Sequence, residues 1–146
     1  MFASKIKLFV TILMLGLLLS ACSLGSFGPP ASCGDNIGGT ADTANFDQTF
    51  TNMALVNQNG VPGTEGENGM EFAATDTLDI RADSNSDVTV RACVQNFNGR
   101  PIAFDGTQTF TQGSSGFSLG SFQSGNYVVR VIVDGVLVKN FPFEIK

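Results

Sequence analysis

Three cysteines are the residues of this 146-residue chain with the clearest capacity for chemistry: Cys22, Cys33 and Cys93. A cysteine thiol can act as a nucleophile, oxidise to a disulfide or accept a lipid. No two of the three stand in a Cys-x-x-Cys arrangement, and the chain contains no histidine. Catalysis by Ser-His-Asp or Cys-His groups is therefore excluded, as are the usual histidine-containing zinc and copper sites. The cysteines suit covalent attachment better than catalysis.

Three glutamates could supply carboxylates for acid–base work. Glu65, Glu67 and Glu71 have the side chains that a glycosidase would place on either side of a sugar bond. They fall in or beside a glycine-rich stretch, where no rigid cleft would hold them in position. We therefore expect no catalytic residue in the chain and predict that it is not an enzyme.

The run from Asp83 to Asp87 alternates oxygen-bearing side chains, as the start of a calcium loop does. Asp83, Asn85 and Asp87 would be the ligands. The run lacks the glycine at the sixth position of the EF-hand pattern, where Val88 stands, and it lacks the distant glutamate. A solvated turn between two strands is the favoured interpretation. The three residues are weak metal candidates, and we expect no metal cofactor.

The first 21 residues have the three parts of an export signal. Lys5 and Lys7 are the only charged residues before residue 35. The twelve residues from Leu8 to Leu19 are apolar apart from one threonine and one glycine. A transmembrane helix needs about 20 apolar residues, so this run is short for a permanent span and suits the core of a cleaved signal.

The junction Leu19-Ser20-Ala21-Cys22 resembles the lipobox of bacterial lipoproteins. The resemblance implies cleavage before Cys22, a diacylglyceryl group on its thiol and an acyl chain, such as palmitate, on its new amine. Two or more chains anchor a protein stably, whereas one holds it only marginally. Ser23, in place of aspartate, implies the outer membrane if the host has one. The alternative is an ordinary secretory signal with a cysteine at the cleavage site.

Cleavage would leave an acidic chain in the cell envelope, outside the cytoplasm, attached to the lipid bilayer through Cys22. Loss of Lys5 and Lys7 would change the formal net charge from −5 to −7 by removing two positive charges. An acidic chain has no electrostatic footprint for DNA or RNA, so we exclude nucleic acid as a partner. The only cofactor expected is the covalent lipid.

Cys33 and Cys93 would then be the cysteines left in an oxidising compartment, and we expect them to form a disulfide. Two unpaired thiols are the alternative. Residues 22–45 are rich in Gly, Ser and Pro, which predicts a flexible tether. A disulfide at Cys33 would pin that tether midway. Residues 46–146 are expected to form one folded domain.

From Phe46 onward the sequence favours β-structure. A first strand is expected around 49–56, although Phe46, Phe50 and Met53 fall at helical spacing. Residues 57–69 contain four glycines and predict a polar loop, which is either mobile or a site.

Two later segments alternate as half-buried strands do. Within 88–95 the valines alternate with residues that include Cys93, so Cys93 should lie on the outer face of its sheet. Within 127–133 the same alternation leads into Asp134-Gly135, the preferred dipeptide of a two-residue type I′ hairpin turn.

The C-terminal hairpin should contain an irregularity. In its simplest register Val131 faces Val138, but Phe143 has the opposite parity to Val138. One face can hold both residues only if an extra residue is inserted, so we predict a β-bulge near 139–140. Pro142 lacks an amide hydrogen, which predicts an edge strand or a break in pairing there. The hairpin is therefore a candidate edge for a partner.

The stretch Gly125-Asn126-Tyr127-Val128-Val129 resembles the run that opens the penultimate strand of immunoglobulin-like and fibronectin-like domains. In those domains the tyrosine hydroxyl bonds back to upstream backbone, and the resemblance implies this role for Tyr127. Residues 70–146 as a whole look like immunoglobulin-like modules of bacterial exported proteins. The expected fold class is all-β, an immunoglobulin-like two-sheet sandwich of about seven to eight strands.

The resemblance implies a lipid-anchored binding or structural module that contacts another envelope protein. The first alternative is a free-standing lipoprotein that binds a ligand or polysaccharide, which would need exposed aromatic residues. The chain has no Trp, and for Phe97 (near Arg100) and Phe104 a core or edge role is favoured. A small carboxylate-based hydrolase is the third reading.

Overall fold

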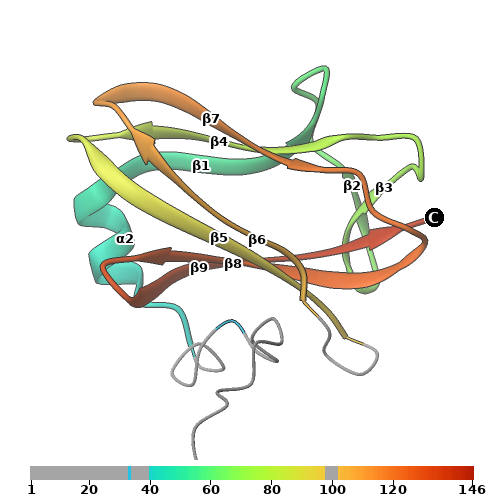
Figure 1. The fold of residues 1–146 in the computed structure, drawn as a ribbon. Coiled ribbons are helices and arrows are strands. Elements are labelled where there is room, and N and C mark those ends of the chain that lie inside the picture. The colour runs from blue at the N-terminus through green and yellow to red at the C-terminus, as the bar shows by residue number, and fades with distance from the viewer. Residues whose placement is uncertain (1–32, 34–39, 98–101) are drawn as a thin grey trace, which may run out of the picture.

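The computed structural model describes Cys33 and residues 40–97 and 102–146. Within these residues one short helix, α2 (Thr43–Thr49), precedes nine β-strands. The strands, in chain order, are β1 (Phe50–Asn57), β2 (Thr64–Gly66), β3 (Gly69–Phe72), β4 (Leu78–Ser84), β5 (Val88–Asn96), β6 (Ile102–Phe110), β7 (Gly113–Gly120), β8 (Gly125–Val133) and β9 (Val136–Ile145). They form two layers, with β1, β4 and β7 in one (Figure 1).

The strand order is that of an immunoglobulin-like sandwich. The three-stranded sheet has the order β1-β4-β7, and the six-stranded sheet has the order β2-β3-β9-β8-β5-β6. If the β2–β3 hairpin is set aside, the first, second and fifth of the remaining strands form one sheet. The third, fourth, sixth and seventh form the other. The predicted all-β sandwich is confirmed, with nine described strands instead of seven or eight.

Alternating apolar residues fill the space between the sheets. Val90 and Val94 of β5 and Val129 and Val131 of β8 are fully buried there. Their neighbours on each strand point out of the sandwich, as the period of two requires. Aromatic residues from both sheets, and one from the connection between β7 and β8, complete this core: Phe50, Phe72, Phe110, Phe117, Phe143 and Phe122.

Tyr127 forms the predicted tyrosine corner. Its ring is buried and stacks on Phe143, with ring centroids 5.2 Å apart. Its hydroxyl donates to the backbone carbonyl of Gln123 at 2.9 Å. The hydroxyl therefore fixes the chain that crosses from β7 to β8 just before β8 enters the core.

The β8–β9 hairpin turns at Asp134-Gly135, as predicted. The φ angles of the two residues are 50° and 79°. Two successive positive φ angles are those of a type I′ turn, whose twist matches that of the strands it joins.

The predicted β-bulge of this hairpin is present, but it lies one residue earlier than expected. Ile132 pairs with Leu137 and Val131 pairs with Lys139, so Val138 is the inserted residue. The predicted pairing of Val131 with Val138 is therefore wrong. The insertion lets Val138 enter the same core as Val131. It thereby resolves the conflict of parity that the sequence displayed.

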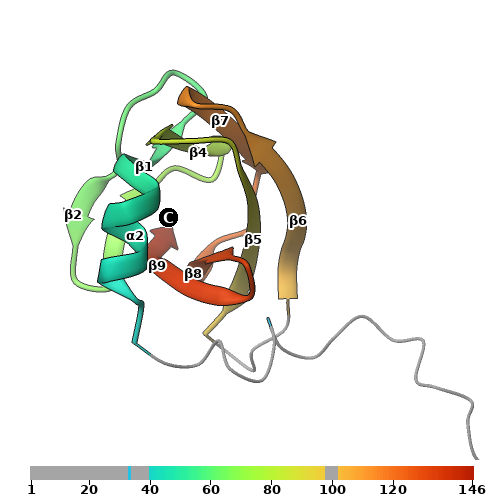
Figure 2. The ribbon, with the colours of Figure 1, turned by 90° about the vertical axis from the view of Figure 1, so that its left-hand side faces the viewer.

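Residues 43–49 form α2, which the sequence analysis did not predict. The side chain of Asp42 caps the helix by accepting from the Asn45 amide at 3.0 Å. Phe46 packs on the core beside Phe50, and the Lys139 ammonium lies 5.0 Å from the Phe46 ring centroid. Helix α2 lies between β1 and β9 at one side of the sandwich (Figure 2).

Residues 57–69 are not one irregular loop. They contain β2, which pairs with β3, and β3 in turn runs parallel to β9, with Met70 opposite Phe143. Only residues 143–145 of β9 have β3 beside them, whereas residues 136–142 have β8 as their one strand neighbour among the described residues. The prediction that the C-terminal hairpin is an edge therefore holds for residues 136–142 and is wrong for the last three residues of β9. The outer strands of this sheet are β2 and β6.

Candidate functional site

The disulfide between Cys33 and Cys93 joins the N-terminal segment to the outer face of β5. The two Cα atoms are 5.8 Å apart, and both side chains are fully buried. They form a second apolar cluster with Ile132 and Leu137, against which Ala41 packs. The predicted disulfide and the outer-face position of Cys93 agree with the structure. Cys22, the predicted lipidation residue, lies outside the described residues.

Beside the disulfide, the same outer face carries two ordered arginines. Arg91 of β5 donates to both carboxylate oxygens of Asp105 on β6, at 2.8 and 2.7 Å. This hydrogen bonding raises the pKa of Arg91 above its ordinary value. Arg130 of β8 donates to the side-chain oxygen of Gln95 at 2.9 Å. The bidentate geometry fixes both side chains of the Arg91–Asp105 pair, although Asp105 is exposed.

An open groove, lined by both polar and apolar residues, lies at the end of this face. Phe97, 57 % exposed, follows the last residue of β5 and borders a hollow of about 430 Å³ with Asn126 and Pro142. A smaller hollow of about 270 Å³ adjoins it at Gly69 and Pro142. The side-chain oxygen of Asn126 is buried and accepts no hydrogen bond from the described residues. An apolar side chain and an unsatisfied acceptor thus lie next to each other.

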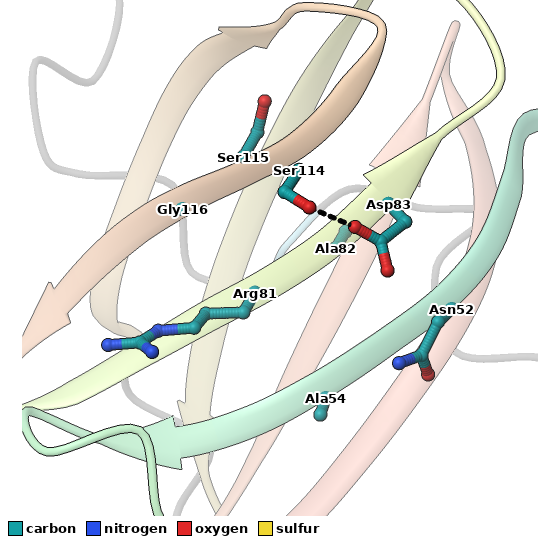
Figure 3. Close-up of a pocket in the computed structure, with 8 residues that line it drawn as sticks. All are labelled: Asn52, Ala54, Arg81, Ala82, Asp83, Ser114, Ser115 and Gly116. Carbon is teal, nitrogen blue, oxygen red and sulfur yellow. Dashed lines mark hydrogen bonds between the residues drawn. The ribbon is translucent and has the colours of Figure 1, made fainter.

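A third hollow, of about 430 Å³, lies on the outer face of the three-stranded sheet (Figure 3). Arg81 lies between two small residues, Ala54 of β1 and Gly116 of β7, because β4 pairs with both strands. Asp83, two residues further along β4 on the same face, accepts a short hydrogen bond from the Ser114 hydroxyl (Figure 3). The small neighbours are what leave room around the arginine.

This hollow is polar and open. Arg81 is exposed, and its guanidinium lies beside Gly60, where an added Cβ would come 2.5 Å from Nη1. A guanidinium held on a sheet face can bind a carboxylate with two hydrogen bonds. None of the eight residues that line the hollow is aromatic, so it offers no surface on which a sugar ring could stack. Asn52, on β1, completes the polar rim.

The three glutamates considered for catalysis do not share a pocket. Glu65 pairs with Met70 across the β2–β3 hairpin, whereas Glu71 pairs with Thr64, so Glu65 and Glu71 project from opposite faces. Glu65 and Glu67 border the two different hollows of the groove. The described residues therefore give no pair of carboxylates on either side of one cleft.

Glu71 belongs instead to an ion cluster at the end of β9. The Lys146 ammonium lies 3.2 Å from the Glu71 carboxylate and 2.9 Å from that of Glu144. Asn68 donates to the second oxygen of Glu144 at 3.2 Å. The hydrogen bond from Lys146, and then that from Asn68, lower the pKa of Glu144. The same bond to Glu144, followed by that to Glu71, raises the pKa of Lys146.

The three weak metal candidates form hydrogen bonds with other residues of the protein. Besides the contact of Asp83 with Ser114, Asn85 donates to the Gln48 carbonyl at 3.0 Å, and Asp87 accepts from the Gln112 amide at 2.8 Å. Within the described residues no three cysteine or acidic side chains come together where they could hold a metal ion. The turn before β5 is built by these separate contacts.

The two phenylalanines considered as a sugar platform have different environments. Phe104 is half-buried, with its ring centroid 5.8 Å from that of Phe117, as a core or edge role predicts. Phe97 is exposed, so the core or edge role does not hold for it. Arg100 lies outside the described residues. The sequence analysis missed Arg81, although the alternation of Asp79, Arg81 and Asp83 with buried residues would have placed it on an outer face.

No protein-family model matches the chain, and no curated protein is significantly similar to it. Within the described part of the chain, no helix combines the length and the apolar character that crossing a bilayer requires.

Proposed function

We propose that the chain is a lipid-anchored, extracytoplasmic immunoglobulin-like module that contacts another protein of the bacterial cell envelope. The observation that carries the proposal is the Cys33–Cys93 disulfide. A disulfide is typical of an oxidising compartment outside the cytoplasm. It also joins the domain to the segment that begins with the proposed lipid attachment residue, Cys22, only eleven residues before Cys33.

Anchoring is tested by replacing the proposed acceptor. Wild-type protein should fractionate with membranes, and the mass of its N-terminal peptide should exceed that of the bare peptide by a diacylglyceryl group and an acyl chain. Cys22→Ala should appear as uncleaved precursor or soluble protein without added lipid mass. A wild-type N-terminal peptide cleaved at this site without lipid would contradict the proposal and support the ordinary secretory signal.

Protein contact is tested by crosslinking in intact cells, followed by detergent extraction. We expect one near-stoichiometric envelope protein with the wild type and its loss with Cys22→Ala. If the protein stays in the membrane and enriches nothing, the partner proposal fails. The anchoring proposal would then stand alone.

The hollow around Arg81 supports a second candidate, a lipoprotein that binds a small ligand. Its chemistry favours a small anionic ligand that carries a carboxylate, because arginine pairs with carboxylates. Thermal-shift screening of such ligands should stabilise the wild type but not Arg81→Gln. Equal shifts in both proteins, or none in either, would exclude this site.

A further inference from the structure

We propose that the outer face of the six-stranded sheet around Cys93 and Phe97 is the side turned to the lipid bilayer, with Phe97 in contact with the membrane interface. This inference rests on the proposed lipid anchor. It adds an orientation of the sandwich relative to the bilayer. In this orientation the three-stranded sheet, with its hollow around Arg81, faces away from the membrane.

This orientation is supported first by the point at which the segment that follows Cys22 is attached to the sandwich. Cys33 is bonded to the outer face of β5, and only eleven residues separate it from Cys22. Eleven residues can span at most roughly 40 Å even when fully extended. Without the disulfide, the first described backbone contact with the sandwich is the bond from Asp42 to Leu137. Twenty residues would then be available, or roughly 70 Å. The disulfide thus places the attachment point on the outer face of β5 and shortens the maximum reach of the segment by roughly 30 Å.

Phe97 lies on the same outer face as the attachment point at Cys93. It follows Cys93 by four residues along β5, about 13 Å at the rise of a strand. It borders Asn126 and Pro142, which belong to the outer face of β8 and β9. An aromatic ring that is 57 % exposed is suited to the boundary between headgroups and acyl chains.

Charge does not distinguish the two sheets. The strands of the six-stranded sheet carry three cationic residues against four anionic ones, Glu65, Glu71, Asp105 and Glu144. The three-stranded sheet carries one cationic residue against two anionic ones, all on β4. Each sheet thus has a net charge of −1, and the orientation rests on the attachment point and on Phe97. The contact between Phe97 and the membrane need not be strong, because the lipid anchor keeps the Phe97 ring at a high local concentration near the bilayer.

The test uses the absence of tryptophan from the chain. Phe97→Trp gives a single fluorophore at the proposed contact. The matched control is Val61→Trp, since Val61 is 54 % exposed in the loop that bridges back to Val56 of the three-stranded sheet. The lipidated proteins are reconstituted into vesicles of phosphatidylethanolamine and phosphatidylglycerol, with and without brominated acyl chains. Only lipid contact allows bromine to quench the indole.

We expect a blue shift and strong bromolipid quenching for Trp at position 97, and neither change at position 61. Vesicle-bound protein with no quenching at 97, or with stronger quenching at 61, would overturn the orientation while leaving the anchor intact. A wild-type chain that carries no lipid and does not bind vesicles would overturn both proposals, and flotation of the vesicles separates these results. Circular dichroism of each variant confirms that the sandwich has folded.

Discussion

The hydroxyl of Tyr127 donates a hydrogen bond to the backbone carbonyl of Gln123, four residues upstream and 2.9 Å away. Tyr127→Phe keeps the stacking on Phe143 and removes only this bond. We expect the free energy of unfolding in urea to fall by about 1 kcal/mol. Gln123→Ala keeps the backbone acceptor and should stay within about 0.5 kcal/mol of the wild type. Equal stability of the two variants would contradict a structural role for the hydroxyl.

The turn between β8 and β9 should be sensitive at its second residue. Gly135 has a φ of 79°, a conformation that a Cβ disfavours, so Gly135→Ala should lower the free energy of unfolding by roughly 1 to 2 kcal/mol. Asp134→Asn is the control, because asparagine tolerates the φ of 50° at that position. Chemical denaturation measures both. A Gly135→Ala protein as stable as Asp134→Asn would mean that the hairpin can change its turn type at no cost.

The disulfide should contribute substantially to stability. It links residues 60 positions apart, and the chain-entropy model gives about 4 kcal/mol for a loop of that size. We expect guanidinium unfolding of the Cys33→Ala, Cys93→Ala double variant to show a loss of this order. Adding a reductant should destabilise the wild type and leave the double variant unchanged. A wild type that unfolds at the same guanidinium concentration with and without reductant would refute this contribution.

The ion cluster at the end of β9 predicts a pH dependence. The pKa of Glu144 is lowered from 4.5, so its contribution is complete above 4.5 and is lost as the pH falls through the lowered value. The pKa of Lys146 is raised from 10.5, so its contribution is complete below 10.5 and is lost as the pH rises further. Lys146→Met should therefore lower the melting temperature slightly between these limits. The difference should shrink below pH 4.5.

Salt provides the control for that measurement. The cluster is exposed to solvent, and roughly 1 M salt screens such charges over about 3 Å. The difference in melting temperature between wild type and Lys146→Met should therefore nearly disappear in high salt at neutral pH. A difference that persists there would arise from the packing of the lysine side chain rather than from its charge.

Features encoded by neighbouring residues were predictable from the sequence. The alternation in β5 placed Cys93 on an outer face, and Asp134-Gly135 specified its own turn. The parity conflict in β9 required a bulge but did not specify the position of that bulge. Whether the inserted residue is Val138 or its neighbour depends on which side chain the core accepts, and that depends on the opposite sheet.

Features encoded by distant residues were not predictable. The pairing of Met70 with Phe143 joins two short stretches that have no local signal for each other. Helix α2 has only seven residues, too few to be stable alone, and it exists because Phe46 packs against the core. The hollow around Arg81 depends on small residues of two other strands, which only the register of β4 brings beside it.

The parallel pairing of β3 with β9 also sets the order in which a chain in transit could complete its fold. The three-stranded sheet has all its strands once residue 120 has emerged, but β2 and β3 have no sheet to join until β9 follows. Contacts across such separations form slowly. A chain threaded through a membrane pore from its N-terminus would thus stay incompletely folded until β9 emerged on the far side. In a chain exported as proposed, β2 and β3 would therefore be the last strands to find their place in a sheet.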